Sequence, residues 1–156
     1  MKLKETLFNA HFPPLAERVR PQILEEFIGQ EHLTGKQKII SMLCEGKQLF
    51  SLIFWGPPGT GKTTLARLIS CHADAELHEL SAVSSGVKEL RQIIKKAEAN
   101  NSMGRQTILF IDEIHRFSKS QQDALLHAVE DGTLVMFGAT TENPSFEVIN
   151  PLLSRC

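Results

Sequence analysis

The chain has 156 residues, 42% of them hydrophobic and 22% charged, which fits one globular domain and excludes a disordered or collagen-like chain. Lys and Arg number 17 against 18 Asp and Glu, so the net charge is −1 and only a local basic patch is left open. No apolar run approaches the ~20 residues of a membrane span, and residues 1–12 lack the apolar segment of a secretory signal. Three cysteines without a Cys-x-x-Cys pair favour a reducing cytoplasm over a disulfide framework or a zinc site.

The first 35 residues hold prolines and glycines between short apolar clusters, which predicts loops and single helical turns. In residues 36–46, Ile39, Ile40 and Leu43 recur at helical spacing. Beyond residue 46, segments with the apolar pattern of a buried strand alternate with segments whose apolar residues recur at helical spacing. They predict strands at 52–55, 76–80, 107–111 and 133–137, and helices at 62–72, 87–99 and 119–130. This alternation predicts a parallel sheet with helices on both faces, whose ligands bind at the carboxyl ends of the strands.

A glycine-rich segment follows the first predicted strand and reads Gly56-Pro57-Pro58-Gly59-Thr60-Gly61-Lys62-Thr63-Thr64. It fits the pattern GxxxxGK[ST] between a strand and a helix, which is typical of a phosphate-binding loop. Its glycines let successive backbone N–H groups turn toward one anion, and the following helix adds its positive end. We expect Lys62 to reach the β- and γ-phosphates of a nucleotide and Thr63 to bind Mg²⁺.

Two acids, Asp112 and Glu113, follow the buried strand at 107–111. The sheet should bring them beside the phosphate-binding loop. Adjacent residues of a strand point to opposite sides, so we expect separate roles for them. Asp112 would face Mg²⁺ and Glu113 would face an attacking water. The second acid favours hydrolysis over nucleotide binding alone.

Two further segments carry polar groups toward the same end of the sheet. Thr140 and Thr141, in the run from Gly138 to Pro144, could contact the γ-phosphate or the water, or could belong to a turn with Asn-Pro chemistry. Arg155 is either a solvated surface charge or an arginine that stabilises phosphoryl transfer in a neighbouring subunit.

With these segments in place, the chain resembles an AAA+ ATPase, a phosphate-loop NTPase of the α/β class. GPPGTGKTT resembles Walker A, ILFIDE resembles Walker B, GATT resembles the sensor 1 strand and LLSRC resembles the Ser-Arg-Cys motif of clamp loaders. Residues 13–156 are similar to the replication-associated recombination protein A family (RarA, or MgsA), whose eukaryotic counterpart is the Werner helicase-interacting ATPase. The segments DEIHRFSKSQQDALL, VEDGTLVMFGATTENPSFEV and ELSAVSSGVKELR carry this similarity.

The resemblance implies a role for individual residues. Residues 36–156 would form the α/β core, and residues 1–35 would form a segment bordering the adenine through Arg20, Ile28 and Gly29. The nucleotide would be held by the loop from Gly56 to Thr64, that is by Gly56, Pro57, Pro58, Gly59, Thr60, Gly61, Lys62, Thr63 and Thr64. Thr63 and Asp112 would hold the metal. Lys62, Glu113, Thr141 as sensor 1 (with Thr140 as second choice) and Arg155, acting in a neighbouring subunit, would be catalytic. His115 and Arg116 match a His-Arg pair of the family without a known mechanism, and a surface or interface position is the default for both.

The resemblance also implies a DNA-stimulated ATPase that acts as a motor or switch in replication-fork maintenance, recombination and repair. Its expected partners are DNA forks, ends and single-strand/duplex junctions, single-strand DNA-binding protein, and copies of itself in a tetramer. Its expected location is the cytoplasm of a bacterium, at the nucleoid. Family members add a fifth strand beside the first one and a lid domain, so we expect this chain to be a fragment. The segment Leu52–Trp55 would then be an apolar sheet edge prone to self-association.

Three alternatives remain open. A clamp-loader subunit would carry a four-cysteine zinc module, and a RuvB-like branch-migration ATPase would carry a β-hairpin between Asp112 and Thr141. A nucleotide-gated scaffold would scarcely hydrolyse ATP. For DNA contacts the candidates are Lys95, Lys96, Arg116 and Lys119, against the alternative of solvated helix faces.

Overall fold

The computed structural model describes residues 13–45 and 48–156, so the expectation about a leader at residues 1–12 lies outside the described residues. The N-terminal part consists of short turns, as predicted. They are α1 (Leu15–Arg18), η1 (Leu24–Glu26) and α2 (Glu31–Thr34), followed by the longer α3 (Ile39–Cys44). None of the residues in the first three elements is buried, so they lie on the body of the protein without a core of their own.

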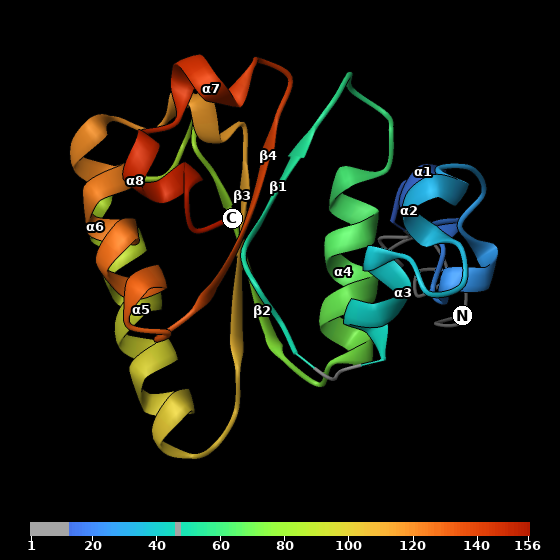
Figure 1. Cartoon of the computed structure of the whole chain (residues 1–156), viewed down its shortest axis with the longest axis horizontal. Coiled ribbons are helices and arrows are strands. Elements are labelled where there is room, and N and C mark those ends of the chain that lie inside the picture. Colours follow the sequence, from blue (N-terminus) through green and yellow to red (C-terminus); the bar gives the residue numbers. More distant parts are fainter. Residues whose placement is uncertain (1–12, 46–47) are drawn as a thin grey trace, which may run out of the picture.

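The centre of the molecule is a parallel sheet in which four strands are described. They are β1 (Leu52–Trp55), β2 (Glu76–Ser81), β3 (Thr107–Asp112) and β4 (Val135–Thr140), in the order β1-β4-β3-β2. All four carboxyl ends therefore lie at one end of the sheet (Figure 1). This confirms the predicted parallel arrangement.

The position of the last strand differs from the prediction of residues 133–137. Gly132 has a φ of 74° and Thr133 donates its N–H to the Asp131 side chain, so the turn after the preceding helix extends further. Leu134 then donates its N–H to the Ala128 carbonyl, and pairing begins only at Val135. As a result Thr140 lies inside β4, opposite Trp55.

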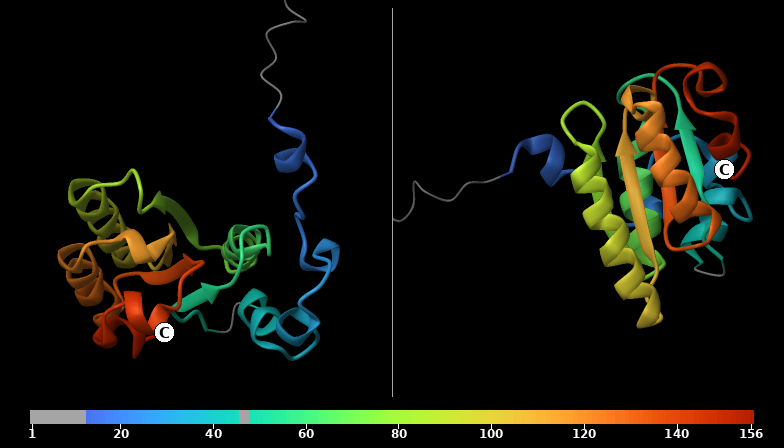
Figure 2. Two further views of the ribbon diagram at one scale, coloured as in Figure 1. Left: turned by 90° about the horizontal axis from the view of Figure 1, so that it is seen from above. Right: turned by 90° about the vertical axis from the view of Figure 1, so that its left-hand side faces the viewer.

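Helices cover both faces of the sheet. The main ones are α4 (Lys62–His72), α5 (Val87–Ser102) and α6 (Lys119–Glu130), with η2 (Ile114–Arg116) after β3 and α7 (Pro144–Glu147) and α8 (Asn150–Leu153) after β4. Figure 2 shows α4 on one face, beside α3, and α5 with α6 on the other. The predicted helix beginnings at Lys62, Val87 and Lys119 are confirmed.

Strand β3 fixes the two layers because it is buried on both faces. Ile108 and Phe110 pack in the cluster with α3 and α4, while Leu109 and Ile111 pack in the cluster with α5 and α6. This period of two is what a central parallel strand requires. The rings of Phe54 and Phe137 also meet edge to face, with centroids 5.8 Å apart. The sheet is thereby a rigid platform for whatever its carboxyl end carries.

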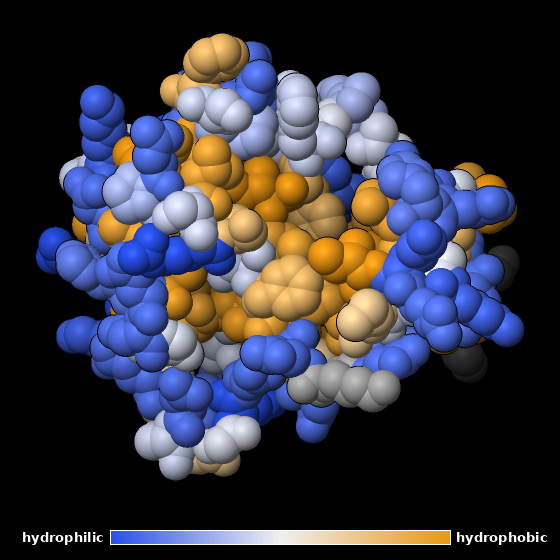
Figure 3. All heavy atoms as spheres, viewed as in Figure 1, coloured by the Kyte–Doolittle hydropathy of each residue, from blue (hydrophilic) through white to orange (hydrophobic). Residues whose placement is uncertain are grey.

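In the described part of the chain, β1 pairs with β4 alone and forms an edge of the sheet. Trp55 at its end is 61% exposed, and Ile39, Met42 and Phe50 are exposed as well. Figure 3 shows apolar side chains gathered over this face. The predicted apolar edge is confirmed, whereas self-association stays a prediction. Among the helices of residues 13–45 and 48–156, none combines the length and apolarity that crossing a membrane demands.

Candidate functional site

The loop between β1 and α4 has the backbone of an anion cradle. Gly59 and Gly61 have φ values of 79° and 91°, which L-residues rarely adopt. A Cβ on Gly59 would meet nothing within 4 Å, so the space above it is open. Helix α4 begins directly afterwards, and the first N–H groups of a helix lack partners within it. These groups and the positive end of the helix dipole favour an anion.

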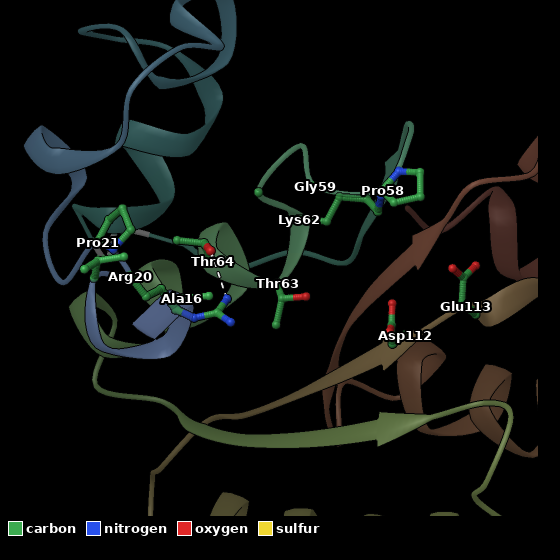
Figure 4. A pocket seen from close by; sticks show the side chains of 12 residues that line it. Ala16, Arg20, Pro21, Pro58, Gly59, Lys62, Thr63, Thr64, Asp112 and Glu113 are labelled. Carbon is green, nitrogen blue, oxygen red and sulfur yellow. Dashed lines mark hydrogen bonds between the residues drawn. The ribbon is translucent and has the colours of Figure 1, made fainter. Parts of the chain in front are cut away.

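A cavity of about 420 Å³ lies against this loop (Figure 4), a size within the usual range for ligand sites. Three parts of the chain line it. The first part is the α1 segment, with Ala16, Val19, Arg20 and Pro21; the second is the loop and α4, with Pro58, Gly59, Gly61, Lys62, Thr63 and Thr64; the third is Asp112 with Glu113. The predicted loop residues Gly56, Pro57 and Thr60 line a neighbouring groove beside β1 instead.

The Lys62 ammonium is held inside the loop by neutral groups. Its Nζ donates to the carbonyls of Gly56 and Pro57, both at 2.8 Å. No carboxylate in the described chain forms an ion pair with it. Since hydrogen bonds to charged oxygens are stronger than those to carbonyls, a phosphate would compete well for this ammonium.

Both predicted acids line the cavity. The alternation of side chains along a regular strand would have placed them on opposite sides of the sheet. They share the cavity because Glu113 leaves the strand geometry and adopts a left-handed backbone with a φ of 54°. The expectation that the two acids point to opposite sides is therefore wrong. In Figure 4 the Thr63 hydroxyl and the Asp112 carboxylate are directed into the cavity from α4 and β3.

These groups fit a magnesium-nucleotide. Mg²⁺ prefers oxygen ligands and phosphates, and the hydroxyl of Thr63 and the carboxylate of Asp112 supply such oxygens beside the loop. The loop offers backbone N–H groups and one ammonium for the phosphates. The residues present are therefore suited to this cofactor by their chemistry.

Glu113 has two further polar neighbours. Thr141 donates its hydroxyl to Glu113 Oε2 at 3.4 Å, so the predicted sensor residue reaches the predicted base. His115 Nδ1 lies 3.1 Å from the same oxygen and 3.0 Å from Thr140 Oγ1. The His115 side chain is only 11% exposed, so it is not an open surface residue, while the interface position expected as the other possibility stays a prediction. Arg116 is exposed, as expected.

Four further predicted site residues are absent from the cavity lining, namely Thr141, which reaches it only through Glu113, and Ile28, Gly29 and Arg155. Ile28 is 95% exposed and Gly29 lies next to it, so neither borders the cavity, and their contact with adenine stays a prediction. Arg155 lies after α8, where its Nη2 forms an ion pair with Glu130 Oε1 at 2.6 Å. It does not reach this chain's own cavity, and its role in a neighbouring subunit stays a prediction.

The α1 segment is attached to α4 by a chain of charges. Arg67 of α4 binds Glu79 through Nε at 2.6 Å and also binds Glu17. Glu17 in turn accepts from Arg20 Nη2 at 2.8 Å, and Arg20 Nη1 donates to Thr64 Oγ1 at 3.0 Å. The hydrogen bonds from Arg20 and Arg67 lower the pKa of Glu17. This ionic chain holds one wall of the cavity in place.

Fold and site together define a phosphate-loop ATPase. The model of the ATPase family associated with various cellular activities (AAA) matches residues 52–156, and the chain belongs to this family. Among curated proteins it is 56% identical to Replication-associated recombination protein A of Escherichia coli K12, over 92% of this chain and 32% of that protein. It is 51% identical to ATPase WRNIP1 of Dictyostelium discoideum, over 93% of this chain and 17% of that one.

Solved structures give the same picture. The RuvB Holliday junction branch migration motor of Thermotoga maritima is 36% identical, with a TM-score of 0.71, over 88% of this chain and 46% of the solved one. The chain spans about a third of the length of the bacterial relatives named Replication-associated recombination protein A.

Proposed function

We propose that this chain binds and hydrolyses ATP within a protein that acts on DNA in replication-associated recombination and repair. One observation carries the ATPase part: Asp112 and Glu113 line the same cavity as the glycine loop and Lys62. The DNA part rests on the printed names of the similar proteins.

The residues of this chain divide the work of binding between them. Backbone N–H groups of the loop and of the first turn of α4 hold phosphate oxygens, and Lys62 exchanges its two carbonyl partners for the β- and γ-phosphates. Thr63 and Asp112 would hold Mg²⁺, which when bound would supply positive charge to offset the charge that develops on the phosphates. Arg20 and Pro21 would border the nucleoside from the α1 segment.

Hydrolysis requires a base that removes a proton from water. We assign this step to Glu113: as the water oxygen bonds to the γ-phosphorus, the bond to the ADP oxygen would break and the proton would pass to Glu113. Thr141 keeps the carboxylate in place and would also contact the γ-phosphate. In a homo-oligomer, Arg155 would leave Glu130 and reach the ATP of the next subunit. We propose that the intact protein forms a tetramer.

The remaining parts of the proposal concern the intact protein. Its ATPase would be stimulated by DNA forks, ends and single-strand/duplex junctions, and it would contact single-strand DNA-binding protein in the bacterial cytoplasm, at the nucleoid. Lys95, Lys96, Arg116 and Lys119 remain candidates for DNA contacts because all four are exposed.

A RuvB-like branch-migration motor is the second candidate, supported by the 36% identity and TM-score of 0.71 to that motor. Against it, the described residues between Asp112 and Thr141 hold only η2, α6 and β4, without an inserted hairpin. A clamp-loader subunit has less support, since only three cysteines occur in the chain. A scaffold that scarcely turns over ATP would leave Glu113 without a task.

The decisive experiment compares two variants of the intact protein in the presence of DNA ends. We expect Lys62→Ala to lose ATP binding, because it removes the one cation among the described loop residues. We expect Glu113→Gln to keep ATP binding and lose turnover. Glu147→Gln changes an exposed glutamate outside the cavity and serves as the matched control. If Glu113→Gln turns over ATP at the native rate, the hydrolytic role is wrong.

A further inference from the structure

We propose that His115 is a positioning residue for hydrolysis: its Nδ1–H holds Oε2 of Glu113 and thereby leaves Oε1 to accept the proton of the water. The inference rests on the proposed role of Glu113 as the base. His115 itself does not line the cavity, so its effect would pass through Glu113.

The geometry ties three side chains to one imidazole nitrogen. Nδ1 of His115 lies 3.1 Å from Glu113 Oε2 and 3.0 Å from the hydroxyl oxygen of Thr140. Thr140 ends β4 and is 1% exposed, so its position is fixed by the sheet. Among the described residues, Oε1 of Glu113 has no hydrogen bond, whereas Oε2 accepts from Thr141 at 3.4 Å and lies against His115 Nδ1. One oxygen is thus anchored and the other is available.

The partners of Thr140 determine which nitrogen carries the proton. A hydroxyl has one hydrogen, and the Glu142 carbonyl, 3.2 Å from Thr140 Oγ1, can accept it. Its oxygen accepts from the Glu142 N–H at 3.0 Å and faces His115 Nδ1 as an acceptor as well. An ionised carboxylate only accepts. A nitrogen that faces two acceptors serves as the donor, so we infer that His115 carries a proton on Nδ1.

Glu113 needs such an anchor more than an ordinary glutamate. Its φ of 54° places the backbone in a region that non-glycine residues rarely occupy, and its side chain has three rotatable bonds. The turn is held by the bond from Arg116 N–H to the Glu113 carbonyl at 2.8 Å, which fixes the backbone but not the carboxylate. The contact from His115 Nδ1, at 3.1 Å, is shorter than that from the Thr141 hydroxyl, at 3.4 Å, and it comes from a side chain that is only 11% exposed.

The same contact connects the base to the phosphate-binding loop. The Thr140 carbonyl accepts the N–H of Gly56, the first residue of the loop, at 3.1 Å. Thr140 therefore touches the loop through its carbonyl and His115 through its hydroxyl. The loop and the Glu113 carboxylate are thereby connected through two hydrogen bonds and the 3.1 Å contact between His115 Nδ1 and Glu113 Oε2.

The test uses two replacements of His115 in the intact protein. Leucine has a similar size but no donor, while the side-chain amide of asparagine places an N–H near the position of Nδ1. We expect His115→Leu to lower kcat about 10- to 100-fold, the loss expected when a catalytic group is misplaced, with the dissociation constant for ATP within about twofold of native. We expect His115→Asn to recover most of that loss. His127→Leu on the exposed face of α6 is the control.

Two outcomes would overturn the inference. Equal kcat losses in both variants, accompanied by weaker ATP binding, would indicate a purely structural histidine; native kcat in His115→Leu would exclude any role. In a Glu113→Gln background, His115→Leu should lower the residual rate no further. If Glu113→Gln is harmless, the proposed function fails; if it is inactive while His115→Leu is not, only the present inference fails.

A spectroscopic measurement gives a readout that does not depend on turnover. Ring ¹⁵N and ¹³C chemical shifts of His115, in protein without nucleotide, distinguish the two neutral forms of the imidazole. We expect the Nδ1–H form, and a change of these shifts in Glu113→Ala. A ring protonated only at Nε2 would contradict the proposed hydrogen bond.

Discussion

Gly138, in the middle of β4, makes room for the residue that follows Glu113. A Cβ built on Gly138 would lie 3.1 Å from Cδ1 and 3.4 Å from Cγ2 of Ile114. Ile114 is completely buried in the cluster with α5 and α6, so it has little space to withdraw. Gly138→Ala should therefore push η2 outward and displace the neighbouring Glu113.

The size of the effect follows from two opposing terms. Overpacking a core by one methyl group costs about 1–3 kcal/mol. Replacing glycine by alanine returns about 0.4–1 kcal/mol by restricting the unfolded chain. The first term wins because the contact is with a buried side chain, and the net loss is about 1 kcal/mol, or about 2–4 °C in Tm for a domain of this size.

The assay is calorimetric unfolding of the intact protein together with its ATPase rate. Ile114→Val removes Cδ1, the atom with the closest approach, and alone costs about 0.5–1.5 kcal/mol. The double variant should be more stable than the sum of the two losses predicts, by about 1 kcal/mol, and should regain part of the lost ATPase rate. Strictly additive losses would refute the steric reasoning.

Three other predictions concern the site and the surface. Arg155→Ala should bind ATP normally but hydrolyse it about 10³-fold more slowly, and mixing it with Glu113→Gln should restore some turnover; no rescue at any ratio would mean that Arg155 does not act between subunits. The hydrogen bond from Asn100 lowers the pKa of Glu76 in the folded protein. The stability that this carboxylate contributes is therefore present above its ordinary pKa of about 4.5 and is lost as the pH falls through the lower folded pKa. Denaturation measured from pH 7 to pH 2 should show that Glu76→Gln has a lower free energy of unfolding than the native protein at pH 7, and that this difference disappears in acid. The exposed edge at β1 should make the isolated 156-residue chain self-associate, and light scattering from a monodisperse monomer would contradict this.

The sequence pattern predicts the sheet and the main helices because the apolar residues on each buried face recur at the spacing of a strand or of a helix. The start of β4 was misplaced because Leu134 is apolar and buried yet belongs to the turn, where its N–H bonds to Ala128. Apolar character alone does not distinguish a strand residue from a buried turn residue.

The candidate site was predicted where a motif carries its own chemistry. The glycine loop, Lys62 and the two acids lie on one cavity, as their positions at strand ends indicated. The left-handed backbone of Glu113 has no signal in a strand-ending Asp-Glu pair. The contact of His115 was missed because its partner Thr140 is 25 residues away and meets it only once β4 is in register. A polar ring two positions after an acid at a strand end is the signal that was available.

The ionic chain from Glu79 to Thr64 has a consequence for how the cavity opens. The α1 segment buries no side chain, and Leu15 and Val19 are exposed, so charges rather than apolar packing attach it. Exposed ion pairs are individually weak and are screened by salt. We therefore expect the α1 segment, residues 15–21, to detach more readily than the sheet unfolds, so rising ionic strength should speed the entry and exit of a nucleotide through that side.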